Sequence, residues 1–123
     1  MDKKEMGRLG EEAVCRLLSG KGFKIVSRNF TVRGGEIDII AESDEIIAFV
    51  EVKTRKADSM LNGFESVTRS KQRLIILTAQ KYLLKHPSVL QPRFDAALAV
   101  FHEGKVITID YIENAFEAAG FIV

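Results

Sequence analysis

Two apolar runs joined by a short polar segment decide the fold. The first is Glu36-Ile37-Asp38-Ile39-Ile40-Ala41, and the second is Ile46-Ile47-Ala48-Phe49-Val50-Glu51-Val52-Lys53. Between them lies Glu42-Ser43-Asp44-Glu45, which is short and polar, so the pattern predicts a β-hairpin. The many apolar side chains in both runs indicate strands near the centre of a sheet.

The segments on either side of this hairpin show helix and strand patterns in turn. The expected elements are, in chain order, a helix over residues 3–19, a strand over 23–30, a tight turn at Gly34-Gly35, the two hairpin strands, a polar loop over 56–66, a helix over 68–86, strands over 94–101 and 106–111, and a short closing helix over 113–119. The buried side of the second helix is expected to consist of Val67, Leu74, Ile75, Leu77, Ala79, Leu83 and Leu84. This order predicts an α/β fold, with a mixed central sheet of about five strands flanked by helices.

The composition is that of an ordinary globular domain. The chain has 123 residues, 46% of them hydrophobic and 28% charged, so we expect one domain over residues 1–123. Its single cysteine, Cys15, excludes an internal disulfide and a cysteine-rich zinc cluster. The charged first residues have no apolar signal core behind them, and no apolar stretch is long enough to span a membrane. We therefore expect a cytoplasmic protein.

Basic residues concentrate in one part of the chain, although the net charge is only +1. Residues 52–81 contain two acidic side chains and seven basic ones, namely Lys53, Arg55, Lys56, Arg69, Lys71, Arg73 and Lys81. Such a block is typical of a surface that contacts a phosphate backbone, but also of a solvated helix face. Charge alone leaves both interpretations open.

Alternation along the two hairpin strands brings charged side chains together. Side chains two residues apart in a strand share a face, so Glu51 and Lys53 point the same way, and Asp38 on the paired strand lies near Glu51. Two carboxylates held close in an apolar setting repel each other unless a cation lies between them. Magnesium accepts one or two carboxylates together with waters and phosphate oxygens, and Lys53 adds a positive charge beside it. The three residues predict metal-assisted hydrolysis of a phosphodiester.

Other charged residues are candidates for supporting roles. Arg55 closely follows Lys53 and is expected to meet a phosphate. Lys71 and Arg73 begin the long helix, whose N-terminus favours anions. Asp95 lies in an apolar strand, where we expect a structural role through Arg93 or a buried backbone group.

Several motifs resemble those of a known family. Gly35-Glu36-Ile37-Asp38 followed by Val50-Glu51-Val52-Lys53-Thr54-Arg55 is similar to the signature of the PD-(D/E)xK nuclease superfamily. Most of the chain resembles the bacterial YraN-like family, which is related to archaeal Holliday-junction resolvases. The matching stretches are Gly7-Arg8-Leu9-Gly10-Glu11, Gly22-Phe23, Arg28-Asn29, Lys71-Gln72-Arg73 and Arg93-Phe94-Asp95.

The resemblance implies a restriction-endonuclease-like fold and an endonuclease that uses magnesium or manganese. Asp38 and Glu51 would be metal ligands, Lys53 the catalytic lysine, and Glu11 a further ligand reaching the site from the first helix. Glu11 lies off the apolar stripe of that helix, so it reaches the site only if the helix end packs at the sheet edge. Branched or otherwise structured DNA is the expected substrate, and a two-fold symmetric junction would suit a homodimer.

Two other function classes remain open. A nucleic-acid-binding module could keep the nuclease fold without catalysis, and the modest net charge of +1 is compatible with it. An interaction protein could use Asp38, Glu51 and Lys53 only as a cross-strand salt-bridge ladder. The first class would bind DNA equally well without magnesium, and the second would bind neither metal nor DNA.

Overall fold

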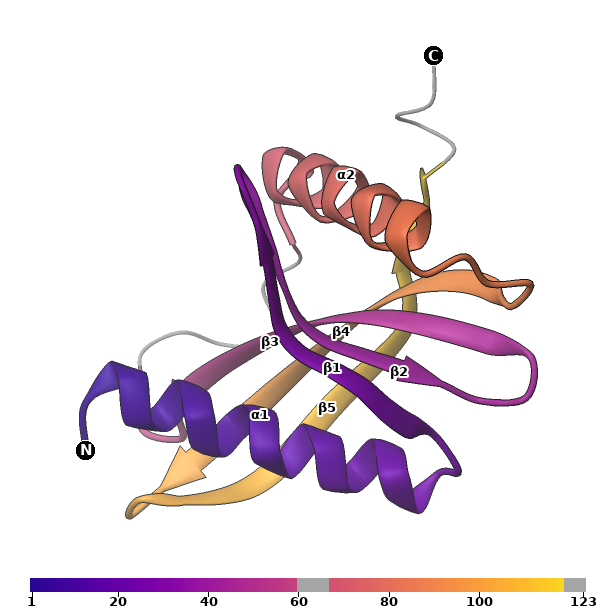
Figure 1. The fold of residues 1–123 in the computed structure, drawn as a ribbon. Coiled ribbons are helices and arrows are strands. Elements are labelled where there is room, and N and C mark those ends of the chain that lie inside the picture. The colour runs from indigo at the N-terminus through magenta and orange to yellow at the C-terminus, as the bar shows by residue number, and fades with distance from the viewer. Residues whose placement is uncertain (60–66, 119–123) are drawn as a thin grey trace.

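The computed structural model describes residues 1–59 and 67–118, which form two helices and a five-stranded sheet. In chain order the elements are α1 (Lys3–Gly20), β1 (Lys24–Val32), β2 (Gly35–Glu42), β3 (Ile46–Lys56), α2 (Arg69–Lys85), β4 (Gln91–His102) and β5 (Lys105–Phe116). The helices lie on opposite faces of the sheet, with α1 below it and α2 above it in Figure 1. The predicted fold class, an α/β mixed sheet flanked by helices, is confirmed.

The order of strands in the sheet follows the order in the chain. β3 and β4 are parallel, and the other neighbouring pairs are antiparallel. A parallel pair needs a crossover connection, which α2 provides. The parallel register runs without a shift from Ile46 opposite Gln91 to Lys56 opposite Phe101. β3 is therefore the middle strand, and its residues are held along their full length by β4.

Each face of the sheet carries its own apolar core. The α1 face buries Val14, Leu18, Ile39, Ala41, Ala48, Val50 and Ala97. The α2 face buries Ile37, Ile40, Ile47, Phe49, Val67, Ile75, Ile76, Ala79, Tyr82, Phe94, Ala96 and Phe116. Along β3, Ile47 and Phe49 thus face α2, whereas Ala48 and Val50 face α1. The alternation of a strand then places Glu51 and Lys53 on the α2 face.

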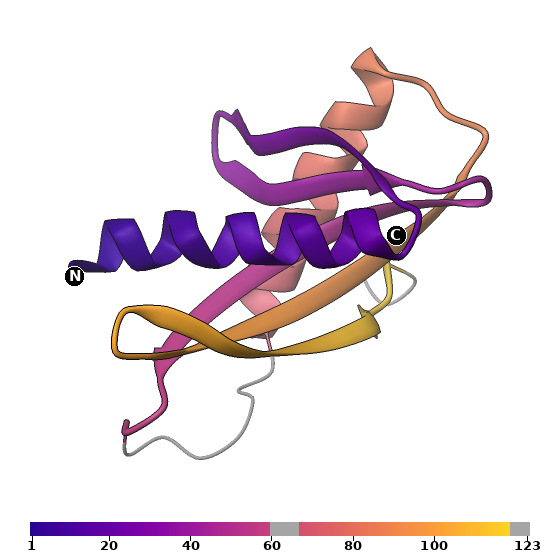
Figure 2. The same cartoon turned by 90° about the horizontal axis from the view of Figure 1, so that it is seen from below.

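The β1–β2 hairpin separates from the rest of the sheet toward α2. β2 pairs with β3 only from Ile39 to Glu42, whereas it pairs with β1 as far as Gly35. At the tip, Gly35 lies so close to α2 that a Cβ would be 2.0 Å from Thr78 Oγ1. Lys81 Nζ of α2 also donates a hydrogen bond to the Arg33 carbonyl, at 3.2 Å. Figure 1 and Figure 2 both show the hairpin curving away from β3.

The buried side of α2 differs from the prediction. Leu74, Leu77 and Leu84 are 47%, 43% and 82% exposed, although all three were expected in the core. The helix instead buries Ile75, Ile76, Thr78, Ala79 and Tyr82. Thr78 faces the sheet because the glycine at the hairpin tip leaves room for it, and its hydroxyl is satisfied by the Leu74 carbonyl at 2.7 Å.

The predicted closing helix over residues 113–119 is wrong as far as Phe116, because β5 continues to that residue. Phe116 stacks on Phe94 of β4 with ring centroids 5.2 Å apart, which holds the end of β5 in the sheet. Residue 119 and most of the polar loop over 56–66, namely 60–66, lie outside the described residues. Within residues 1–59 and 67–118, neither helix has the length and apolar character that a membrane crossing needs.

Gly10 lets α1 lie directly against the sheet. A Cβ at this position would lie 2.7 Å from Thr54 Cγ2 of β3 and 3.5 Å from Ala99 Cβ of β4. The first distance is too short for two carbon atoms, so a side chain here would push the helix away. In Figure 2, α1 runs across the strands on this face. The close approach also sets how near the next residue, Glu11, lies to the sheet.

We expect Gly10→Ala to lower the free energy of unfolding by about 1–2 kcal/mol, because the new methyl group overpacks against Thr54. In a Thr54→Ser background, where Cγ2 is absent, the same substitution should instead raise stability by up to about 1 kcal/mol, through the helix propensity of alanine. Urea unfolding of the four proteins measures both effects. An equal effect of Gly10→Ala in both backgrounds would contradict this contact.

Candidate active site

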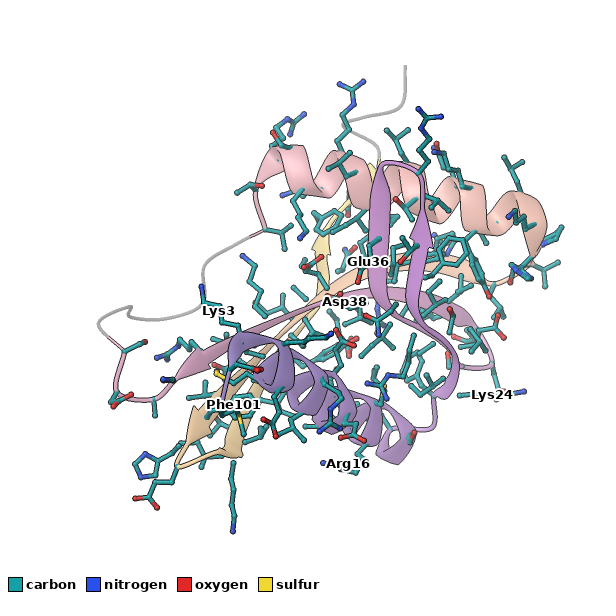
Figure 3. All side chains as sticks on the ribbon, turned by 60° about the vertical axis from the view of Figure 1, so that its left-hand side comes forward. Lys3, Arg16, Lys24, Glu36, Asp38 and Phe101 are labelled. Atoms are coloured by element: carbon teal, nitrogen blue, oxygen red, sulfur yellow. The ribbon has the colours of Figure 1, made fainter. Side chains whose placement is uncertain are left out.

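Asp38 lies at the point where β2 separates from β3. The main-chain ladder between the two strands ends at Ile39 opposite Val50. Beyond it, the Val52 N–H donates a hydrogen bond to Asp38 Oδ2 at 2.8 Å. The carboxylate thereby replaces the main-chain acceptor that β2 no longer supplies to β3. Figure 3 shows Glu36 and Asp38 on this arm of the hairpin, between the levels of α1 and α2.

The surroundings of Asp38 disfavour its ionised form. Burial, followed by the negative charge of Glu51, raises the pKa of Asp38 from 3.8 to about 7, although the hydrogen bond from Val52 acts in the opposite direction. Glu11 and Glu36 contribute smaller repulsive effects. The repulsion from Glu51 agrees with the predicted closeness of the two carboxylates. Such a pair becomes more favourable when a cation binds.

Glu51 is buried at the same place, on the α2 face of β3. It is one of the buried charged residues, and burial raises its pKa. Lys71 is the main factor that lowers the pKa of Glu51, because its Nζ lies 3.3 Å from Glu51 Oε1. The positive charge of Lys53 also lowers this pKa. Glu51 therefore lies between two lysines, of which the sequence predicted only Lys53 as a neighbour.

Glu11 lies at the edge of this group. Its carboxylate forms an ion pair with Arg28 of β1, at 3.7 Å. Burial raises the pKa of Glu11, against the effects of Asn29 and Arg28. Its charge acts on Asp38, so the close packing of α1 does bring Glu11 into the neighbourhood of the site. Arg28 and Asn29 were not predicted as site residues; their only signal in the sequence was the Arg28-Asn29 motif.

The two carboxylates Asp38 and Glu51 suit a magnesium ion, which takes one or two carboxylates and completes its shell with waters and phosphate oxygens. No three His, Cys, Asp or Glu side chains of residues 1–59 and 67–118 are grouped so as to hold a metal. Glu11 is therefore not gathered with Asp38 and Glu51 into a three-ligand site. The donor set fits an ion that keeps much of its hydration shell.

The remaining candidates for nucleic-acid binding differ in solvent exposure. Arg55 is partly buried on β3, and Arg73 is exposed on α2. Lys71 is 53% exposed at its side chain, and its ammonium is directed to Glu51. A surface hollow at Glu11 is lined by residues of both charges from the start of α1, namely the basic Lys3, Lys4 and Arg8 and the acidic Asp2 and Glu5.

Asp95 has the structural environment that its sequence suggested. It is fully buried and accepts hydrogen bonds from Arg93 Nε at 2.9 Å and from Arg93 Nη2 at 3.0 Å. It also accepts one from Tyr111 Oη at 2.5 Å and one from the Asn114 N–H at 2.9 Å. Both carboxylate oxygens are thus used within the fold. Because Asn114 is bound in this way, Asp95 anchors the end of β5 that was expected to be helical.

Asp38→Asn should stabilise the metal-free protein at neutral and alkaline pH. The unfolded chain ionises Asp38 near pH 3.8 and the folded protein near pH 7, so wild-type stability falls between these values and the loss persists above them. Asparagine keeps an acceptor for Val52 without the charge. We expect a gain of about 2–4 kcal/mol at pH 8 and little change at pH 4. Urea unfolding in EDTA measures this, with Asp44→Asn in the exposed turn as control; a gain independent of pH would contradict it.

Asp95→Ala should lower the free energy of unfolding by about 3–5 kcal/mol, because it leaves the partly buried Arg93 without its main partner. Tyr111→Phe removes only one of the hydrogen bonds and should cost about 1 kcal/mol. Thermal unfolding compares the two variants. If the two costs were equal, the network around Asp95 would not hold the end of β5 as described.

Similar sequences place the chain in a family. The Uncharacterised protein family UPF0102 matches residues 10–99. A UPF0102 protein of Myxococcus xanthus is 37% identical over 118 residues, which cover 95% of this chain and 93% of the relative. Another, of Desulforapulum autotrophicum, is 42% identical and covers 94% and 95%, and one of Clostridium perfringens is 42% identical and covers 92% and 94%. The chain therefore belongs to the UPF0102 family, in agreement with the resemblance of its motifs to the YraN-like proteins.

Proposed function

We propose that this protein is a metal-dependent endonuclease that hydrolyses phosphodiester bonds of nucleic acid. The observation that carries the proposal is the pair of buried carboxylates Asp38 and Glu51, with Lys53 two residues along the same strand. A fold gains no stability from two buried like charges held close together, so their presence between two apolar cores favours a functional role.

Asp38 and Glu51 are the residues that would hold magnesium or manganese. When bound, the ion would neutralise phosphate oxygens and lower the pKa of a bound water. The hydrogen bond from Val52 fixes Oδ2 of Asp38, and Oδ1 would be the oxygen that ligates the ion. The residues of β3 contribute rigidity, because this strand is paired along its length with β4.

Lys53 supplies the positive charge on the same face as Glu51. Its role is to stabilise negative charge that develops on the phosphoryl group, or to hold the attacking water and stabilise the hydroxide that forms from it. Removal of a donor of this kind typically lowers the rate by ~10²- to 10³-fold. Glu11, paired with Arg28, orients the edge of the site and adds negative charge near Asp38.

The basic block from β3 to α2 favours nucleic acid as the substrate. Arg55, Lys71 and Arg73 lie on these two elements, and the N-terminus of α2 adds a favourable dipole for phosphate. The preference for branched DNA, and the homodimer that a symmetric junction would suit, rest on the resemblance to resolvases. DNA is proposed over RNA on the same ground.

One observation favours a second candidate, a nucleic-acid-binding module without catalysis. Glu51 already has a cationic partner, because Lys71 lies 3.3 Å from it. Its charge is partly balanced without any metal. A binding module of this kind would hold DNA equally well with and without magnesium, and would not depend on Lys53.

Cleavage of labelled single-stranded, duplex, flap and four-way-junction DNA, with magnesium or manganese, tests the proposal. We expect cutting that needs the metal and that falls by at least ~10²-fold in Asp38→Ala and Lys53→Ala. Asp44→Asn and Lys24→Ala, both at exposed positions, should cut as wild type does. Asp44→Asn removes one negative charge, as Asp38→Ala does, and Lys24→Ala removes one positive charge, as Lys53→Ala does. Each test variant thus has a control with the same change in net charge.

Two results would count against catalysis. Absence of cutting by the wild type on every substrate would do so, as would equal cutting by Asp38→Ala and Lys53→Ala, which would point to a contaminating nuclease. DNA binding that persists in EDTA and in Lys53→Ala would then make the binding module the better proposal.

A further inference from the structure

Lys71 and Glu51 form an ion pair whose two members differ strongly in exposure to solvent. Glu51 is 9% exposed at its side chain and is fixed on the central strand β3, whereas Lys71 is 53% exposed. The solvent around the half-exposed ammonium weakens the pair and can take the place of Glu51 as its partner, whereas the buried carboxylate depends on a nearby cation. The ammonium of Lys71 can therefore move to another partner, while the carboxylate of Glu51 stays on the central strand.

The backbone of Lys71 is held in place, while its side chain is half-exposed. Thr68 caps α2, and its Oγ1 accepts a hydrogen bond from the Lys71 N–H at 3.2 Å. The next residue, Gln72, donates from Nε2 to the Val67 carbonyl at 2.8 Å. The start of α2 is thus anchored on both sides of Lys71. A flexible four-carbon stem on a fixed backbone lets the ammonium move between partners without moving the helix.

The contact with Lys71 involves the same carboxylate that a metal would use. A divalent cation at Asp38 and Glu51 would meet Lys71 as a competing positive charge. Once displaced, the ammonium would remain at the N-terminal turn of α2, where phosphate is favoured. Lys53, by contrast, lies on the same strand and the same face as Glu51 and is partly buried.

We propose that Lys71 is an internal counter-ion of Glu51 that a divalent cation displaces, and that the released ammonium then binds a phosphate of the nucleic acid. This inference rests on the proposed function, because it requires a metal at Asp38 and Glu51. It makes Lys71 a positioning residue that couples the two ligands. Metal and nucleic acid each strengthen the binding of the other, because both favour the state in which Lys71 has left Glu51.

Calorimetric titration with Mg²⁺ at pH 8 tests the first half of the proposal. Lys71→Gln should bind Mg²⁺ ~3- to 10-fold more tightly than wild type, because the competing charge is gone. Lys71→Arg keeps the charge and should bind as wild type does. Lys85→Gln removes the same charge from the last turn of α2 and should leave the affinity unchanged. Circular dichroism of each variant checks that it is folded.

Binding of a labelled four-way DNA junction tests the second half. All proteins carry Lys53→Ala, so that cleavage of the junction in the presence of Mg²⁺ is slowed by at least ~10²-fold during the measurement. In this background Mg²⁺ should strengthen junction binding when Lys71 is present, and Lys71→Gln should remove at least half of that gain. Lys85→Gln should retain the gain, which separates a specific role of Lys71 from a general loss of positive charge.

The outcomes separate this inference from the function on which it rests. If Asp38→Asn binds Mg²⁺ as well as wild type does, no metal uses the site, and both proposals fail. If binding depends on Asp38 but Lys71→Gln binds no more tightly, only the counter-ion proposal fails. Tighter metal binding by Lys71→Gln with an unchanged metal effect on junction binding overturns the transfer of Lys71 to phosphate.

Discussion

The hydrogen bond from the Val52 N–H to the Asp38 carboxylate is the interaction on which the arrangement of the site depends. β2 must leave β3 for the β1–β2 hairpin to pack against α2, and this leaves a donor of the central strand without a main-chain partner. A side chain from β2 supplies the acceptor, so the strands separate without exposing an unsatisfied amide. The same step places a carboxylate beside Glu51. Asp38 therefore completes the hydrogen bonding of the central strand and is also a candidate metal ligand.

The buried carboxylates of the site lower the stability of the fold when they are ionised. Asp38 and Glu51 both have raised pKa values, with burial as the first cause, while the strands that hold them are packed on both faces by apolar cores. Asp95 shows what the same fold does with a buried carboxylate that serves structure. It receives hydrogen bonds on both oxygens, from Arg93, Tyr111 and Asn114. Asp38 and Glu51 have different partners, the Val52 N–H for Asp38 and the ammonium of Lys71 for Glu51, and the charge of Glu51 acts on Asp38.

The strand pattern predicted the hairpin and the closeness of Asp38 to Glu51, because alternating apolar residues constrain which charges share a face. The sequence pattern did not predict which side chains are buried, or where a strand ends, at positions where packing between distant elements decides this. Ile37 and Ile39 belong to different cores, against strict alternation, because the hairpin bends between them. Leu74, Leu77 and Leu84 of α2 were assigned to the core by hydrophobicity but are exposed. Thr78 and Tyr82 are buried instead, since they fit the hairpin tip and Phe49. The end of β5 is held by Asp95 and Phe94, neither of which is close to it in sequence.

A nuclease site has to reconcile carboxylates that bind metal with a substrate that is itself an anion. Among the described residues near Asp38, the carboxylates Glu11, Glu36 and Glu51 add negative charge, and uncompensated they would repel a phosphate backbone. The structure places a cation against two of them, Arg28 against Glu11 and Lys71 against Glu51. The first pair joins α1 to β1 and so ties the hairpin to the helix, whereas the second joins the central strand β3 to the first turns of α2. Lys71, at 53% exposed, is the more exposed of the two cations, and it pairs directly with a proposed metal ligand. The second pair is therefore the one through which the charge of the site can change when ligands bind.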